Sequence, residues 1–134
     1  MQKIGIDIKF FRAHFQFINY ALSILWIMTL INAFNIIDIL DGLCSGITIL
    51  ILITIIIIAK LTGSQSVLYT AAALIIPVSA FYIFNFPPAK IFLGNSGSMM
   101  IGLIISILTI DISYTSVNII SLIIPIMITG LPLY

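Results

Sequence analysis

Residues 44–61 read CSGITILILITIIIIAKL, an apolar run in which Lys60 carries the one charge. A helix needs about 20 mostly apolar residues to cross the hydrocarbon core of a bilayer. The run is rich in isoleucine, a residue that favours β-strands in soluble proteins. Inside a bilayer, however, a segment must satisfy its own backbone hydrogen bonds, so a helix is the expected structure. The run therefore predicts a transmembrane helix.

Four further apolar runs predict more membrane helices. They cover residues 17–35, 67–85, 98–110 and 117–133, of which the run at 98–110 is short. The sequence lacks the ten-residue alternation of apolar and polar residues that marks transmembrane strands. We therefore predict an all-α polytopic membrane protein with about five transmembrane helices, forming one membrane domain over residues 1–134.

The composition of the chain excludes several other classes. Of the 134 residues, 62% are hydrophobic and 7% are charged, and the net charge is +1. A soluble domain has about 25% charged residues. So little charge excludes a soluble domain, a disordered chain and a nucleic-acid-binding protein, which must neutralise phosphates.

Two polar connections interrupt the apolar runs, at residues 32–43 and 84–98. Two predicted helices separate them, so both connections should lie at the same membrane face. Polar side chains at that depth are costly unless they are hydrated, paired or face a polar site, which makes them functional candidates. The remaining charged residues fall on the other face: Lys3, Asp7, Lys9, Arg12, Lys60 and Asp111.

The first connection contains Asn35, Asp38 and Asp41 at intervals of three residues. On a helix each such step turns about 60° backwards, so the three side chains would share an arc of about 120°. A structural interpretation is that Asp38 or Asp41 caps the helix that starts near Cys44. The spacing by itself does not decide between these interpretations.

The second connection pairs glycines with small hydroxyl residues: Gly94, Ser96, Gly97 and Ser98. Such a stretch presents backbone N–H groups at a helix start, which suits phosphate, although a plain turn is the simpler interpretation. Lys90 adds a cation nearby, and Phe92 either stacks on a base or anchors at the membrane interface. Ser98 and Gly102 form a small-xxx-small pair, which suits close helix packing.

Together the two connections resemble the paired motifs of the polyprenyl-phosphate N-acetylhexosamine-1-phosphate transferases. Residues 32–46 are similar to the family's Asn-x-x-Asn-x-x-Asp-Gly-x-Asp-Gly-Leu motif. Residues 84–102 are similar to its Phe-Asn-x-x-Pro-Ala-Lys-Ile-Phe-Met-Gly-Asp-x-Gly-Ser motif. The resemblance is closer to the branch that starts wall teichoic acid, O-antigen lipopolysaccharide or related glycans than to the peptidoglycan branch.

The resemblance implies transfer of a GlcNAc-1-phosphate type group from a UDP-sugar to undecaprenyl phosphate, with release of UMP. By matching positions it places Asn35, Asp38 and Asp41 around the nucleotide, with the two aspartates as catalytic candidates. It assigns substrate binding to Lys90, Phe92, Gly94, Ser96 and Gly97, with the Phe92 ring on uracil. It further implies a bacterial cytoplasmic (inner) membrane protein and leaves a homodimer open.

The implied cofactor is Mg²⁺, and Asn95 stands where the family has its metal-binding aspartate. Mg²⁺ prefers anionic hard oxygen, so a neutral amide predicts weak or absent Mg²⁺-dependent turnover. Ile39 also replaces the glycine that follows the first aspartate. The chain is short for the family, because the paired-aspartate loop expected upstream and the histidine loop expected downstream are missing. We therefore expect an internal fragment of such a transferase.

Two other classes of function stay open. One is a non-catalytic membrane remnant or partner subunit, which Asn95 and Ile39 favour. The other is a small transporter, because polar loops between broken helices also bind anions; it explains the aspartates but not the order of both motifs. Orientation is open as well. The basic residues would place the motif face outside by the positive-inside rule, whereas the resemblance places it in the cytoplasm.

Overall fold

The computed structural model describes residues 8–115, where the regular structure is helical. The helices are α1 (Ile8–Ile37), α2 (Leu43–Thr62), α3 (Gln65–Asn85) and α4 (Gly94–Thr115). Each contains a segment long and apolar enough to cross a membrane: Gln16–Ile37, Leu43–Thr62, Gln65–Asn85 and Gly94–Ile112. The all-α class is therefore confirmed for the described residues, which contain four helices long and apolar enough to cross a membrane rather than the five expected. The fifth expected helix, 117–133, lies outside the described residues.

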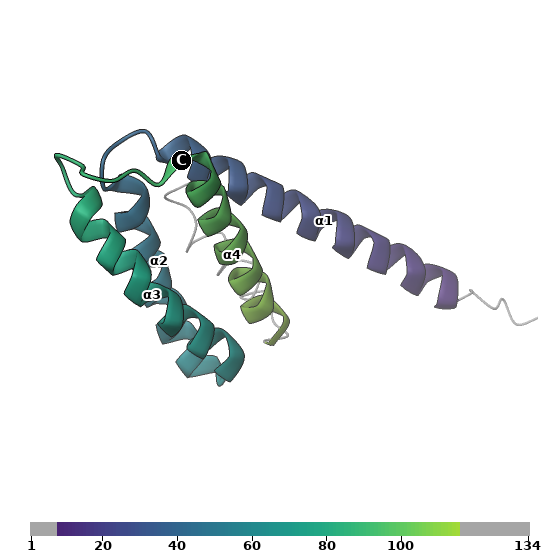
Figure 1. Ribbon diagram of the computed structural model, residues 1–134. Coiled ribbons are helices and arrows are strands. Elements are labelled where there is room, and N and C mark those ends of the chain that lie inside the picture. Colours follow the sequence, from purple (N-terminus) through teal and green to yellow (C-terminus); the bar gives the residue numbers. More distant parts are fainter. Residues whose placement is uncertain (1–7, 116–134) are drawn as a thin grey trace, which may run out of the picture.

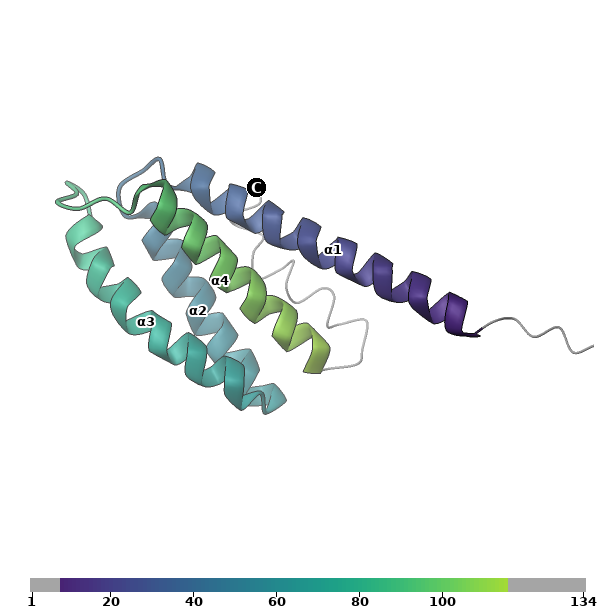
Figure 2. The ribbon, with the colours of Figure 1, turned by 45° about the vertical axis from the view of Figure 1, so that its right-hand side comes forward.

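Three helices lie side by side, and the fourth extends past them. α1 packs mainly against α4, α2 packs mainly against α3, and α2 also contacts α4. The N-terminal part of α1 runs away from the other helices (Figures 1 and 2). Its side chains Phe17, Tyr20 and Leu25 are exposed, as expected for a helix surrounded by lipid.

Glycines mark both ends of α2. Gly42 precedes the helix and Gly63 follows it, each with a φ of 76°, a left-handed conformation that glycine adopts at little cost. Ser64 N donates to Ala59 O at 3.0 Å and closes the last turn. This short reversal holds α2 and α3 together as an antiparallel pair (Figure 1).

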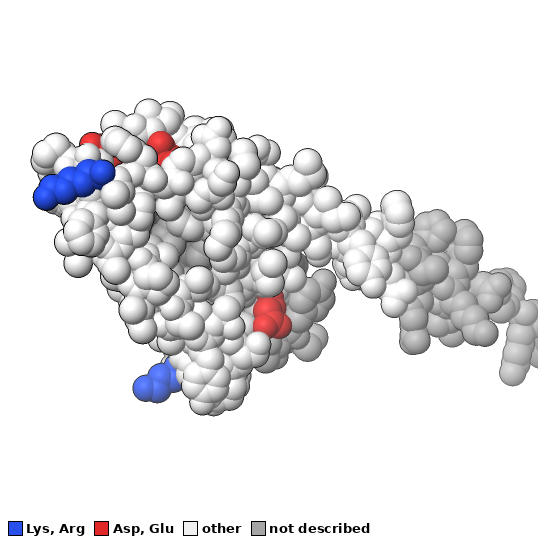
Figure 3. All heavy atoms as spheres, in the orientation of Figure 1, with Lys and Arg blue, Asp and Glu red and all other residues white. Residues whose placement is uncertain are grey.

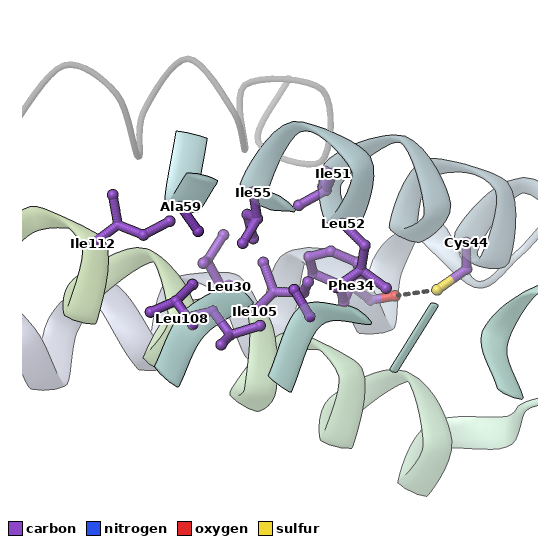
Figure 4. Packing of buried hydrophobic residues seen from close by; sticks show 12 residues of the cluster. Leu30, Phe34, Cys44, Ile51, Leu52, Ile55, Ala59, Ile105, Leu108 and Ile112 are labelled. Atoms are coloured by element: carbon purple, nitrogen blue, oxygen red, sulfur yellow. Dashed lines mark hydrogen bonds between the residues drawn. The ribbon is translucent and has the colours of Figure 1, made fainter. Parts of the chain in front are cut away.

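The buried core lies mainly where α1, α2 and α4 meet (Figure 4). Leu30 and Phe34 of α1 are fully buried there. Their apolar neighbours on α2 and α4 include Ile51, Leu52, Ile55, Ile105, Leu108 and Ile112. Lipid is as apolar as these side chains, so close packing and hydrogen bonds between helices supply much of the association energy.

The contact between α1 and α4 is close at a glycine. A Cβ atom placed on Gly102 would lie 2.8 Å from the Leu30 carbonyl oxygen and 2.9 Å from the Ile31 Cα. Two backbones can approach this closely only because Gly102 lacks a side chain. Further along the same interface, Trp26 Nε1 donates to Thr109 Oγ1 at 3.1 Å. The predicted small-residue packing is thus confirmed at Gly102.

Candidate functional site

Two connections meet at one end of the helices. The acidic turn, residues 38–42, joins α1 to α2, and the proline connection, residues 86–93, joins α3 to α4. Figure 1 shows both at the end opposite the α2–α3 turn. We call this end of the molecule the loop end. The shared face expected from counting helices is confirmed, because a hydrogen bond between Ala89 and Asp41 joins the two connections directly.

Asp41 makes one of these bonds. Its Oδ2 atom accepts from the backbone N of Ala89 at 3.1 Å, while the side chain remains exposed. The N-cap position of α2 belongs to Gly42, which has no side chain with which to cap the helix. The capping interpretation of Asp38 or Asp41 is therefore wrong, because the Asp41 carboxylate is bonded to the proline connection instead.

The three polar residues of the first motif do not share a helical face. α1 ends at Ile37, so Asn35 is helical, whereas Asp38 and Asp41 lie in the acidic turn. The predicted common arc is wrong because the chain must reverse between α1 and α2, and it does so in a tight turn. Asp38 is partly buried, and desolvation raises the pKa of its carboxyl above the ordinary value.

Asn35 joins α1 to the start of α4. Its Oδ1 accepts a hydrogen bond from Ser98 Oγ at 3.3 Å, and Ser98 is fully buried. The same hydroxyl lies 3.2 Å from the carbonyl oxygens of Gly94 and Asn95 in the first turn of α4. The end of α1 therefore contacts the first turn of α4 through Asn35 and Ser98.

The glycine and serine stretch of the second motif forms the first turn of α4. The helix begins at Gly94 rather than at the predicted residue 98, so Asn95, Ser96 and Gly97 are helical. Gly94 has a φ of 67°, and a Cβ on Gly97 would lie 2.7 Å from Leu93 Cγ. The predicted helix start is too late because this first turn is rich in glycine and polar residues. The first N–H groups of α4 lack partners within the helix and suit an anion.

Lys90 and Phe92 project from the proline connection. The backbone N of Lys90 donates to Phe84 O at 2.9 Å, which anchors the connection to the end of α3. The Lys90 side chain is exposed, and the Phe92 ring is 75% exposed. Charged side chains gather at the two ends of the helices, with a broad uncharged surface between them (Figure 3). The loop end therefore offers a cation and an aromatic face beside two carboxylates.

Asn85 is the residue of this region to which the sequence analysis gave no role. It is 4% exposed, and its Oδ1 accepts hydrogen bonds from Gly42 N and Ser45 Oγ, each at 3.0 Å. Its Nδ2 donates to Ile91 O at 3.0 Å. An amide at the end of an apolar span is the signal that could have identified it, since a buried polar group needs partners.

The donor atoms at the loop end do not form a closed metal site. Among the described residues there is no group of three or more His, Cys, Asp or Glu side chains that could hold a metal ion. The carboxylates that the described residues bring to this end are those of Asp38 and Asp41, and Asn95 adds a neutral amide. Asn95 lies in the first turn of α4, where the helix dipole disfavours a cation. Mg²⁺ would need phosphate oxygens of a substrate as further ligands.

The chain is similar in sequence to a known protein family and to several curated proteins. The family model described as "Glycosyl transferase family 4" matches residues 2–113. A probable undecaprenyl-phosphate N-acetylglucosaminyl 1-phosphate transferase of Bacillus subtilis (strain 168) is 42% identical over 86% of this chain and 32% of its own length. An undecaprenyl-phosphate alpha-N-acetylglucosaminyl 1-phosphate transferase of Thermotoga maritima is 33% identical over 77% of this chain and 30% of its own length.

A more distant relative is the phospho-N-acetylmuramoyl-pentapeptide-transferase of Streptococcus equi subsp. equi (strain 4047). It is 30% identical over 79% of this chain and 32% of its own length. The chain thus spans about a third of the length of these curated relatives. No solved structure matches the chain.

Proposed function

The chain belongs to glycosyl transferase family 4, and from that premise we propose that its loop end binds a UDP-sugar for transfer of a sugar-1-phosphate. The reaction proposed is transfer of GlcNAc-1-phosphate to undecaprenyl phosphate with release of UMP, at the start of cell-wall or surface-glycan synthesis. The observation that carries this proposal is the Asp41–Ala89 hydrogen bond, which joins the two motif connections at one membrane face. A UDP-sugar is a cytoplasmic substrate, so the loop end is assigned to the cytoplasmic side.

The proline connection and the start of α4 are assigned to the nucleotide and its phosphates. Phe92 offers an exposed ring on which uracil can stack, which is worth about 1–3 kcal/mol per base. Lys90 supplies a mobile cation for a pyrophosphate oxygen. The backbone N–H groups of Gly94, Ser96 and Gly97 lie at the positive end of the α4 dipole and suit a second phosphate oxygen.

The acidic turn is assigned to the chemistry. Asp41 is held against the proline connection and so has a fixed position beside the bound nucleotide. Burial raises the pKa of Asp38, and its carboxylate is assigned to accept a proton from the phosphate of the lipid. Asn35 contacts the first turn of α4 through Ser98. Mg²⁺, when bound with substrate phosphates, would neutralise charge on the pyrophosphate.

One observation favours a second candidate function, a membrane subunit that binds the nucleotide without turning it over. Asn95 contributes a neutral amide at the position where the family motif has a carboxylate. Nucleotide binding through Phe92, Lys90 and the α4 N-terminus does not need that carboxylate. Transfer does need it, because the carboxylate would hold the Mg²⁺ that neutralises charge on the pyrophosphate. Such a subunit would retain UDP-sugar affinity and lack transfer.

Two measurements on the 134-residue chain in lipid nanodiscs distinguish the two candidate functions. Calorimetry measures binding of UDP-GlcNAc, with CMP as a nucleotide control, and a radiolabel assay measures transfer to undecaprenyl phosphate in Mg²⁺. Binding with transfer supports the transferase. Binding without transfer supports the nucleotide-binding subunit. Lack of selective UDP-GlcNAc binding would overturn both.

A further inference from the structure

From a buried position, Asn85 bonds to two backbone groups and one side chain in other segments of the chain. One side-chain oxygen accepts from Gly42 N, in the acidic turn, and from Ser45 Oγ, in the first turn of α2. The side-chain nitrogen donates to Ile91 O, in the proline connection. Both connections that carry the motif residues are therefore bonded to the same amide group, which itself sits at the last residue of α3.

The surroundings of Asn85 make this link hard to replace. The Asn85 side chain is 4% exposed, so water cannot take over bonds that are lost. Gly42 has a left-handed φ of 76°, and a Cβ placed there would lie 3.4 Å from Pro87 Cδ and 3.5 Å from the Tyr82 ring. The acidic turn is therefore packed against the end of α3 as well as bonded to it.

An aspartate or a leucine of similar size could not hold both connections. The bonds on Oδ1 need an acceptor and the bond to Ile91 O needs a donor, and an amide is the side-chain group that offers both at adjacent atoms. The Asp41–Ala89 hydrogen bond lies close to both groups that Asn85 binds. Asp41 directly precedes Gly42 in the chain, and Ala89 lies two residues before Ile91. Asn85 therefore holds the backbone next to each partner of that bond.

We propose that Asn85 is a positioning residue: it sets the spacing between the acidic turn and the proline connection, and so holds Asp41 in place for nucleotide binding. The nucleotide half of this proposal rests on the proposed function, whereas the spacing half does not. Asn85 acts through Gly42 and Ile91, and no contact with substrate is assigned to it here.

The test uses the full chain, labelled with ¹⁵N, in detergent micelles. Hydrogen exchange is measured at the amides of Gly42 and Ala89, and calorimetry gives the affinity for UDP-GlcNAc. Asn85→Leu removes all three hydrogen bonds of the side chain. Asn85→Asp keeps the acceptor for Gly42 but loses the donor to Ile91 O. Thr109→Val is the matched control, because it removes the part-buried Trp26–Thr109 bond between α1 and α4, away from the loop end.

For Asn85→Leu we expect exchange at Gly42 and Ala89 to become about tenfold faster and UDP-GlcNAc binding to weaken about tenfold, as for the loss of a buried hydrogen bond. Asn85→Asp should keep Gly42 protected, release Ala89, and weaken binding less than Asn85→Leu. Thr109→Val should lower the unfolding temperature and leave both amides and the affinity within about twofold of the parent chain.

The proposal is overturned if Asn85→Leu leaves exchange at Gly42 and Ala89 unchanged, or if Thr109→Val alters them as much. If Asn85→Leu does not fold, Asn85→Asp decides: equal effects on both amides, or none on either, contradict the proposal. If the parent chain does not bind UDP-GlcNAc, the proposed function fails, and the exchange rates still decide whether Asn85 sets the spacing.

Discussion

The carboxylate of Asp41 accepts a hydrogen bond from the backbone N of Ala89 at 3.1 Å, although 48 residues separate the two in the chain. Each residue belongs to one of the two motifs. In the sequence, helices α2 and α3 lie between the two connections, and the bond brings these connections together in one polar surface. Substitutions at Asp41 can separate the contribution of the hydrogen bond from that of the charge.

Asp41→Asn keeps an oxygen that can accept from Ala89 N but removes the charge, whereas Asp41→Ala removes both. We expect Asp41→Ala to weaken UDP-GlcNAc binding about tenfold and to speed exchange of the Ala89 amide. Asp41→Asn should retain protection of that amide and still lose transfer activity. Asp111→Asn, near the opposite end of the helices, is the charge control. Equal loss of binding in Asp111→Asn would show that the effect is not local to the loop end.

Phe92→Leu tests stacking on uracil. The Phe92 ring is 75% exposed, so its replacement removes little packing within the chain. Base stacking on an aromatic ring is worth about 1–3 kcal/mol, so we expect UDP-GlcNAc affinity to fall about tenfold. Phe84→Leu, at 54% exposure near the end of α3, serves as the control and should bind normally. An unchanged affinity in Phe92→Leu would assign that ring to the membrane interface instead.

Asn95→Asp restores a carboxylate in the first turn of α4. A negative charge there is favoured by the helix dipole by about 0.3–1 kcal/mol, and it supplies the anionic oxygen that Mg²⁺ prefers. We expect Mg²⁺-dependent transfer, measured as UMP release with and without EDTA, to rise about tenfold or more. Asn95→Gln, which stays neutral, should leave it at the parent level. Full Mg²⁺-dependent turnover by the parent chain would contradict the weak-metal prediction.

Gly102→Ala tests the close contact between α1 and α4. The added Cβ would meet the Leu30 carbonyl oxygen at 2.8 Å, and this is backbone that cannot rotate away. We expect a loss of about 1–3 kcal/mol in the free energy of unfolding, measured by titration with SDS. Gly46→Ala is the control, because its Cβ meets the Tyr82 side chain at 3.3 Å, and a side chain can adjust. A larger loss in Gly46→Ala would contradict the assignment of Gly102.

Asp38 gives the chain a defined pH dependence. Burial raises the pKa of Asp38 in the folded chain above the ordinary 3.8, so the folded state binds more protons than the unfolded state between the two values. The free energy of unfolding should therefore fall as pH rises through that interval and level off above the folded pKa. Asp38→Asn should remove this slope in thermal unfolding curves recorded from about pH 3.5 to 7. A variant that keeps the same slope would assign it to another group.

Much of the fold follows from composition along the chain. Runs of apolar residues located the four spanning helices, and the counting of helices placed both connections at one face, because a bilayer admits little else than helices of this length. The α4 start was misplaced at residue 98 instead of Gly94, because glycine, asparagine and serine are uncommon inside helices and common before them. Propensity is a weak guide where tertiary contacts hold the turn.

Residue spacing placed the candidate site without giving its geometry. Periodicity grouped Asn35, Asp38 and Asp41 on one helical face, but α1 stops at Ile37 and each of the three has a separate surrounding. Neither the bond from Ala89 to Asp41 nor the bonds from Gly42 and Ser45 to Asn85 could be read from spacing, since the partners are distant in the chain. Long-range pairing depends on how the helices pack.

The apolar runs and the two motifs are enough to predict a helical membrane chain in which two polar connections share one face. These properties depend on local apolar runs and on the hydrogen-bonding needs of a backbone in lipid. The packing of the helices is needed to see that Asp41 bonds to the proline connection rather than capping α2, and that Asn85 bonds to both connections. A buried polar group bonds to whichever partners packing brings near, and packing is a property of the whole fold.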